Sequence, residues 1–308
     1  MRLPVRVDAL SPNWTRVRGA GDAMRLLRRP ARAQQGPVVR EVRCKTVLNR
    51  SSISDYSLNC YLGCEHGCVY CYARFMQRFH PHPEPWGEFV DVKENAVEVL
   101  SRQLKRARPG QVFMSSACDA WQPMEQEREL SRECCRLLVD KGFHLNILTK
   151  SSLVLRDLDV FDRGTVRVGV TIVTLDEELG RLWEPRASSI GERIRIIAQA
   201  RAAGLETAVM LGPLLPFLSD SQASIDSLFA LASDHAVSEI SVDALNPRPR
   251  VWPSVAGLLR REYPDMRERY RRLLFDRAAR ALYLRELSER VERSAARHRL
   301  GDRVHVCF

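Results

Sequence analysis

The stretch of sequence that decides the fold runs Asn59-Cys60-Tyr61-Leu62-Gly63-Cys64-Glu65-His66-Gly67-Cys68-Val69-Tyr70-Cys71-Tyr72. Cys64, Cys68 and Cys71 have the spacing C-x3-C-x2-C. Three thiolates this close on a glycine-containing loop can ligate three irons of a cubane 4Fe-4S cluster. The fourth iron then lacks a protein ligand and can bind a substrate or cofactor, as the open position of a catalytic zinc site does.

A structural zinc site is the alternative interpretation of this loop, with Cys60 or His66 as the fourth ligand. Structural zinc usually takes paired C-x2-C motifs on two separated segments. The distant pair is missing, because the other cysteines are Cys44, Cys118, Cys134, Cys135 and Cys307. The spacing therefore favours the iron–sulfur cluster and makes Cys60 a spare thiol near it. A metal-binding module without enzyme activity stays open as the alternative function.

Short apolar runs alternate with segments of helical periodicity after this loop. The pattern predicts strands at 112–115, 145–149, 166–173, 207–211 and 239–242, and helices at 94–106, 127–141, 190–203 and 224–233. A further strand is expected near 42–47. Such alternation predicts an α/β fold with a parallel sheet and crossover helices. About six units suit an open or partial barrel better than a closed eightfold one.

The net charge of +10 is concentrated at the two ends of the 308-residue chain. Residues 1–43 carry +7, residues 247–308 carry +8, and the stretch between them carries −5. We therefore expect a basic arm (1–41), a core (42–246) and an Arg-rich helical extension (247–308). Residues 22–29 of the arm are its one candidate helix. In the extension, 264–298 is predicted to be a long helix with a buried stripe of Tyr270, Leu273, Leu274, Ala278 and Leu282.

Basic chain ends are compatible with nucleic-acid contact. Two observations weaken that interpretation. Arginine outnumbers lysine 43 to 5, which indicates a general compositional habit, and many C-terminal arginines alternate with acidic residues. Mixed charge of this kind is typical of a solvated helix face.

Composition excludes several classes of protein. With 45% hydrophobic and 28% charged residues the chain has an ordinary globular balance. Its apolar runs are too short for a membrane span, and residues 1–10 lack the apolar core of a secretory signal. Nine cysteines without an export signal predict a reducing, cytoplasmic location.

The cysteine spacing, with an aromatic residue directly before Cys71, resembles the radical S-adenosylmethionine (SAM) superfamily. Residues 63–74 resemble more narrowly the branch that contains spore photoproduct lyase. Later segments agree with that branch in order, namely 115–123, 148–151, 175–178, 184–186 and 212–216. The similarity covers about residues 42–245. It implies a partial (β/α)6 barrel of the TIM type, with its site at the carboxyl ends of the strands.

The resemblance also implies cofactors and a reaction. The open iron of a 4Fe-4S cluster would bind the amino and carboxylate groups of SAM. One electron would then cleave SAM into methionine and a 5′-deoxyadenosyl radical, which abstracts hydrogen from an unidentified substrate. A reductant of flavodoxin or ferredoxin type is the expected partner. A nucleic-acid substrate, as for a DNA or RNA lesion lyase, and a small-molecule or peptide substrate both stay open.

Site residues are implied by the same resemblance. Cys64, Cys68 and Cys71 would ligate the cluster, and SAM would contact Tyr72, Ser115, Ser116, Asp119, Lys150, Thr171, Thr174 and Arg186. Each contact has a structural alternative. The Ser/Asp residues are common in turns, lysines are common on surfaces, and threonines favour strands. A local ion pair between Glu184 and Arg186 is the alternative for the Glu184-Pro185-Arg186 segment.

Tyr70, Tyr72 and Cys118 are the expected catalytic residues. Tyr70 and Tyr72 match tyrosines of the lyase, although both can simply shield the cluster from solvent. In the lyase a cysteine at the position of Ser116 returns hydrogen to the product radical. A serine O–H bond is much stronger than a thiol S–H bond, so Ser116 is unsuited to that step. Cys118 can replace it if both residues lie on one face, and a small buried apolar role is its alternative.

Overall fold

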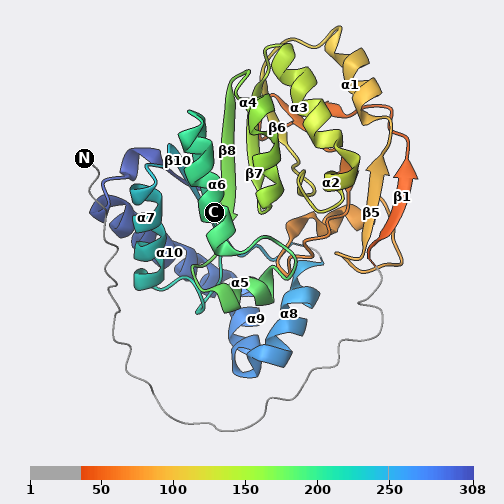
Figure 1. Ribbon diagram of the computed structural model, residues 1–308. Helices are drawn as coiled ribbons and strands as arrows, with labels where there is room; N and C mark the ends of the chain where they lie inside the picture. The colour runs from red at the N-terminus through yellow and green to blue at the C-terminus, as the bar shows by residue number, and fades with distance from the viewer. Residues whose placement is uncertain (1–35, 249) are drawn as a thin grey trace, which may run out of the picture. The chain divides into compact units, whose positions relative to one another are not determined.

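The main sheet has eight strands in the computed structural model, which describes residues 36–248 and 250–308 (Figure 1). Its strands are β2 (Leu48–Arg50), β3 (Tyr56–Leu58), β6 (Gln111–Met114), β7 (His144–Thr149), β8 (Val166–Ile172), β9 (Glu206–Leu214), β10 (Glu239–Ala244) and β11 (Val304–Val306). The spatial order is β11-β10-β9-β8-β7-β6-β3-β2. All neighbours are parallel except β2 and β3. Since β2 and β11 are edges, the sheet is open, and the predicted partial barrel is confirmed.

The central strands are buried on both faces. In β8 the side chains of Val166, Val168, Val170 and Ile172 are all buried. Gly169 lies between them, and a Cβ at this position would come within 2.8 Å of the Ile147 carbonyl oxygen on β7. This apolar run with glycine at a close backbone approach is what a parallel strand covered on both sides requires.

The predicted helices form close to their expected bounds. They are α1 (Ala96–Leu104), α3 (Leu130–Asp140), α6 (Ile190–Ala202) and α7 (Gln222–Asp234), with the shorter α2 (Glu125–Arg128), α4 (Leu158–Phe161) and α5 (Glu177–Trp183) between them. α3 packs on β7 and α6 packs on β8 and β9 (Figure 1). Helix α6 starts with a capping box, in which Ser189 and Glu192 satisfy each other's backbone N–H groups. The five strands predicted after the cysteine loop are confirmed as well.

The strand predicted near 42–47 is wrong. Residues 43–47 form no strand, and the first strand of the barrel is instead β3, which precedes the cysteine loop. Its three residues are too short a run to show a period. A second, three-stranded sheet contains β1 (Val38–Val42), β5 (Phe89–Lys93) and β4 (Tyr61–Leu62) in the order β1-β5-β4.

The C-terminal part of the chain is divided differently from the prediction. It contains α8 (Val251–Glu262), α9 (Arg267–Phe275) and α10 (Arg277–Arg297). The Asp276 side chain accepts a hydrogen bond from Ala279 N and starts a new helix. Tyr270, Leu273 and Leu274 are buried as predicted, but Ala278 and Leu282 are exposed. The buried stripe of α10 is Tyr283, Leu287 and Val291.

Residues 37–308 form one compact unit. The expected helix at 22–29 and most of the basic arm lie outside the described residues. No helix in the described part of the chain is long and apolar enough to cross a membrane.

Candidate functional site

The cysteine loop leaves β4 through a sharp turn at Gly63. Its φ is +84°, and a Cβ there would lie 2.4 Å from the Phe89 carbonyl oxygen, so only glycine fits. Cys64 and Cys68 are buried and Cys71 is half-buried. Short turns close the loop, since Gly67 N donates to the Cys64 carbonyl and Cys71 N donates to the Cys68 carbonyl. All nine cysteines of the chain are free thiols.

The segment that follows β6 fixes one side of this loop. The fully buried Gln122 side chain accepts a hydrogen bond from Glu65 N at 2.9 Å and donates one to the Gly63 carbonyl at 3.3 Å. In return the Glu65 carboxylate accepts a hydrogen bond from Met124 N at 2.6 Å. Neither Gln122 nor Glu65 was predicted as a site residue, although both lie in the segments that carry the family resemblance.

Helix α5 and the residues after it contact another part of the cysteine loop, around Val69 and Tyr70. Val69 N donates to the Trp183 carbonyl at 2.9 Å, and the Tyr70 hydroxyl donates to the Glu184 carboxylate. Glu184 pairs with the guanidinium of Arg193 at 2.6 Å, and both side chains are buried. Burial and the Glu184 charge raise the pKa of Tyr70 well above its ordinary value. The predicted catalytic Tyr70 therefore anchors the loop.

Arg193 was not predicted as a site residue, although the sequence carries one signal for it. It is a charged residue on the buried stripe of α6, between Ile190 and Ile196. Its guanidinium also donates to the Thr171 carbonyl at 3.0 Å, which connects the end of β8 to the same buried group.

Arg186 contacts the back of the cysteine loop. Its Nη2 atom donates to the Gly87 carbonyl at 2.6 Å. A Cβ on Gly67 would lie 2.9 Å from the same atom, so the guanidinium packs directly on the loop backbone. The Glu184–Arg186 ion pair, which was the structural alternative for this segment, does not form, because Glu184 pairs with Arg193 and Arg186 lies 3.4 Å from Glu88.

The end of β6 brings three predicted residues, Ser115, Ser116 and Cys118, next to the cysteine loop and Tyr72. The half-exposed Tyr72 donates its hydroxyl to the Ser116 carbonyl at 2.5 Å. Ser115 has a left-handed backbone with φ +64°. Cys118 Sγ lies 3.5 Å from the Tyr61 carbonyl and 3.7 Å from Ser115 Oγ. Burial raises the pKa of the Cys118 thiol to about 12, so it stays protonated at neutral pH.

Asn59 was not predicted, yet it links β3 to this strand end. Its side chain donates to Ser116 Oγ at 3.3 Å and accepts from Ala117 N at 2.9 Å. Asn59 lies outside the C-x3-C-x2-C spacing, so the cysteine pattern did not indicate a role for it.

Asp119 ties the ends of β6 and β7 together. One carboxylate oxygen accepts hydrogen bonds from Trp121 N and Thr149 Oγ1, and the other accepts one from Lys150 N. His66 Nδ1 lies 3.4 Å from the second oxygen. Both oxygens are therefore engaged by protein donors, and the carboxylate positions the strand ends.

The side chain of Lys150 makes no hydrogen bond among the described residues, unlike the side chain of Thr174, which was also predicted to contact SAM. Lys150 Nζ lies 5.9 Å from the Tyr70 ring centre. Burial lowers the pKa of Lys150, but Cys68, Glu184 and Asp119 outweigh it and raise the pKa, so the ammonium stays charged. Thr174 Oγ1 instead accepts a hydrogen bond from Asp176 N. Thr171 and Thr174 are both buried at the end of β8.

Cys60 does not join the other three cysteines. Its side chain is fully buried, and its Sγ lies 3.7 Å from Cys134 Sγ on α3. Within residues 36–248 and 250–308, no group of three or more His, Cys, Asp or Glu side chains is arranged to hold a single metal ion. The donor set of the loop is thus three free thiols with Cys60 turned into the core. Three thiols of this kind fit a cubane with one open iron.

A family model described as the radical SAM superfamily matches residues 58–227, which include the cysteine loop and strands β4 to β9. The chain belongs to the radical SAM superfamily. As a radical SAM protein it is an enzyme of that class, and its relatives include proteins of archaea and bacteria.

An uncharacterized protein of Mycobacterium bovis is 33% identical over 296 residues, covering 89% of this chain and 86% of that protein. An uncharacterized protein of Methanocaldococcus jannaschii is 34% identical over 183 residues, covering 58% of this chain and 69% of that protein.

Among solved structures, spore photoproduct lyase complexed with dinucleoside spore photoproduct has a similar fold. The TM-score is 0.63 at 15% identity, with 88% of this radical SAM chain and 82% of the lyase covered. A lyase variant with bound SAM and the same dinucleoside gives a TM-score of 0.65 at 15% identity, with 88% and 81% covered. This likeness agrees with the open α/β barrel.

Proposed function

We propose that the protein cleaves SAM reductively and uses the resulting 5′-deoxyadenosyl radical to abstract hydrogen from its substrate. The observation that carries the proposal is the cysteine loop, on which Cys64, Cys68 and Cys71 are free and Cys60 points elsewhere. When bound, a reduced 4Fe-4S cluster would give one electron to SAM and be oxidised by it, and the C–S bond of SAM would break to leave methionine and the radical.

The residues of the chain prepare this chemistry in three ways. Gln122 bonds to the backbone of the first part of the loop and Glu184 to Tyr70 near its last cysteine, so both ends of the loop are held in place. The free ammonium of Lys150 is suited to pair with the carboxylate of SAM. Tyr72 is half-exposed beside the end of β6, where it can cover the cofactor from solvent.

Ser115, Ser116 and Cys118 complete the proposed wall around SAM at the end of β6. The Cys118 thiol is protonated and lies beside Tyr61 and Ser115. It is the candidate hydrogen donor to a substrate radical, in place of Ser116. The electron is expected from a cytoplasmic reductant of flavodoxin or ferredoxin type, because the loop provides thiols for one cluster only.

Metal content and SAM cleavage test the proposal together. Protein reconstituted anaerobically with iron and sulfide is expected to be brown, with about four irons per chain. After reduction with dithionite it should release 5′-deoxyadenosine from SAM. Cys68→Ala should lose both properties.

Cys60→Ala and Cys118→Ala are matched controls that remove a nearby thiol, and both should keep the iron. Colourless protein with one zinc per chain, or iron loss in the controls equal to that in Cys68→Ala, would overturn the assignment.

A further inference from the structure

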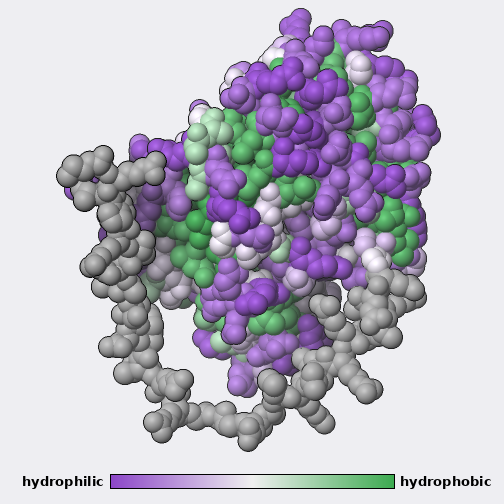
Figure 2. All heavy atoms as spheres, viewed as in Figure 1, coloured by the Kyte–Doolittle hydropathy of each residue, from purple (hydrophilic) through white to green (hydrophobic). Residues whose placement is uncertain are grey.

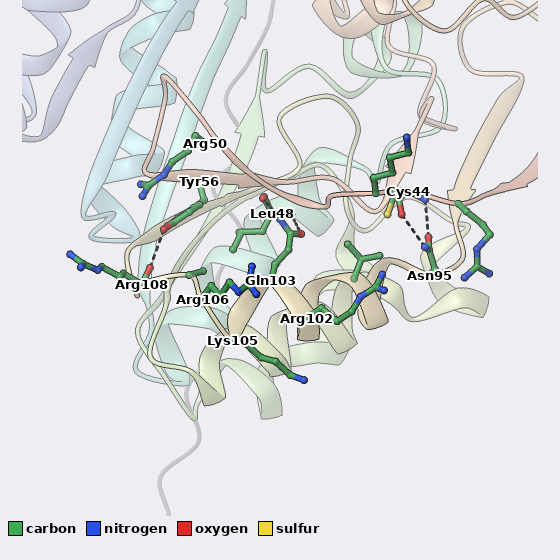
Figure 3. A pocket seen from close by; sticks show the side chains of 14 residues that line it. Cys44, Leu48, Arg50, Tyr56, Asn95, Arg102, Gln103, Lys105, Arg106 and Arg108 are labelled. Atoms are coloured by element: carbon green, nitrogen blue, oxygen red, sulfur yellow. Dashed lines mark hydrogen bonds between the residues drawn. The ribbon is translucent and has the colours of Figure 1, made fainter.

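A groove of about 1210 Å³ lies between the edge strand β2 and the end of α1, and none of its residues belongs to the cysteine site (Figure 3). Its volume exceeds the roughly 300–1,000 Å³ of ordinary small-molecule pockets. Seven of its fourteen lining residues are cationic, and none is acidic. The cationic residues are Arg43, Lys45, Arg50, Arg102, Lys105, Arg106 and Arg108.

Two amide side chains, Gln103 on α1 and Asn95 directly before α1, fix the walls of this groove. Gln103 accepts hydrogen bonds from Val47 N and Leu48 N and donates one to the Leu48 carbonyl. Asn95 makes the same kind of paired contact with the backbone of Cys44. The Tyr56 hydroxyl donates to the Arg108 carbonyl, which holds the loop after α1. The backbone that carries the cationic side chains is therefore held by hydrogen bonds within the protein, without any ligand.

Most of the positive charge is left uncompensated. Arg43 pairs with Glu94 at 2.9 Å, and Arg102 lies 3.7 Å from Glu98. Within the described residues, Lys45, Arg50, Lys105, Arg106 and Arg108 have no carboxylate partner. All five are exposed, and the Cζ atom of Arg50 lies over the Tyr56 ring, 4.5 Å from its centre. Figure 2 shows a mostly hydrophilic surface around α1.

The chemistry of these side chains favours a phosphate polymer over an acidic protein. An arginine guanidinium can donate two parallel hydrogen bonds to two oxygens of one phosphate. A protein partner would need exposed apolar anchors at the centre of its interface. Among the described residues, none of the large exposed apolar side chains lines the groove.

We propose that this groove binds the phosphodiester backbone of a nucleic acid. The site goes beyond the proposed radical chemistry, because the groove and the cysteine loop share no residue. Binding through backbone phosphates is independent of sequence and strongly dependent on salt.

The test compares two triple variants of the full-length, cluster-loaded protein. Arg50→Gln/Arg106→Gln/Arg108→Gln removes three charges from the groove. Arg267→Gln/Arg277→Gln/Arg285→Gln removes three exposed charges from the C-terminal helices, where these arginines also have no carboxylate partner among the described residues. Fluorescence anisotropy with a labelled 20-nucleotide single strand and with its duplex, at several salt concentrations, measures binding. The double variant Arg106→Gln/Arg108→Gln leaves the Arg50–Tyr56 contact intact in case the groove triple folds poorly.

The wild type is expected to bind at least one of the two probes with a steep salt dependence. The groove triple should bind at least tenfold more weakly at 0.1 M salt, and its slope of log K against log salt should fall by about 2 to 3. The control triple should stay within about twofold of the wild type. Equal losses in both triples, or a wild type that binds neither probe at 50 mM salt, would overturn the proposal.

The same samples separate this inference from the proposed function. The groove triple should release 5′-deoxyadenosine from SAM, without substrate, at the wild-type rate. Groove-dependent binding in a protein that cannot cleave SAM would refute only the radical chemistry. SAM cleavage without groove-dependent binding would refute only the nucleic-acid site.

Discussion

Glu184 connects the cysteine loop to the core of the barrel through two partners. It accepts a hydrogen bond from Tyr70, which stands between the last two cysteines of the loop, and it pairs with the buried Arg193 on α6. A buried charge that loses its partner is costly, whereas a lost neutral donor costs less. The position of the loop therefore depends more on the charge of Glu184 than on the Tyr70 hydroxyl.

Replacing Glu184 by glutamine should destabilise the protein strongly. The variant leaves Arg193 buried without a counter-charge, and we expect the free energy of unfolding to fall by about 3 to 5 kcal/mol. Tyr70→Phe removes only the hydroxyl and should cost roughly 1 to 3 kcal/mol. Urea denaturation followed by circular dichroism measures both. A Glu184→Gln variant as stable as Tyr70→Phe would show that the ion pair does not support the loop.

Two glycines with similar backbone angles should respond differently to alanine. Gly204→Ala, at φ +80° with open space around it, should cost about 1 to 2 kcal/mol for the left-handed backbone alone. Gly63→Ala has the same strain and in addition a contact of 2.4 Å with the Phe89 carbonyl. We expect a clearly larger loss of thermal stability for Gly63→Ala. Equal melting temperatures of the two variants would argue against the tight turn before Cys64.

At the scale of elements, α7 and α10 are joined by a small polar cluster. Asp226 on α7 accepts hydrogen bonds from Ser294 Oγ at 2.6 Å and Gln222 Nε2 at 3.3 Å, and it pairs with Arg297. The hydrogen bond from Ser294, helped by Gln222 and Arg297, lowers the pKa of Asp226 below its ordinary value. The Asp226 carboxylate thus adds a polar link between α7 and α10 to the packing of the buried stripe of α10.

This link should make the stability of the protein depend on acid pH. A carboxylate whose pKa is lowered by folding adds stability above its unfolded pKa of about 4, and the addition is lost as the pH falls through the folded value. The difference in unfolding free energy between the wild type and Asp226→Asn should therefore be largest near pH 6 and shrink toward pH 3. Denaturant titrations at several pH values measure it. A difference that stays constant down to pH 3 would contradict the assigned link.

Most helices and strands of the barrel core could be predicted because their apolar patterns repeat over long stretches of sequence. Helix α6 and strand β8 each repeat an apolar pattern over seven or more residues. Strands β3 and β11 have three residues each and show no period, so they could not be found. The split between α9 and α10 depends on one capping side chain, Asp276, inside an otherwise helical pattern. Local chemistry overrode the longer pattern there.

At the scale of the whole molecule, the cysteine loop was predictable because its ligands are close in sequence. The residues that hold the loop in place could not be predicted. They are Gln122, Glu184 and Arg193, which come from distant segments that the fold brings together. Sequence spacing identifies what can bind a cluster, but not which buried groups hold the loop in place. The basic groove was missed for the same reason, because its charges come from two stretches that meet only in the folded chain.

The proposed radical chemistry depends on an iron that three cysteines leave open. Low-temperature electron paramagnetic resonance of the reduced, cluster-loaded protein, with and without SAM, tests this most directly. We predict that SAM changes the spectrum of the wild type and of Cys60→Ala in the same way. A wild-type spectrum that SAM does not change, and that SAM changes only when Cys60 is replaced, would show that Cys60 occupies the fourth position and would contradict the open iron.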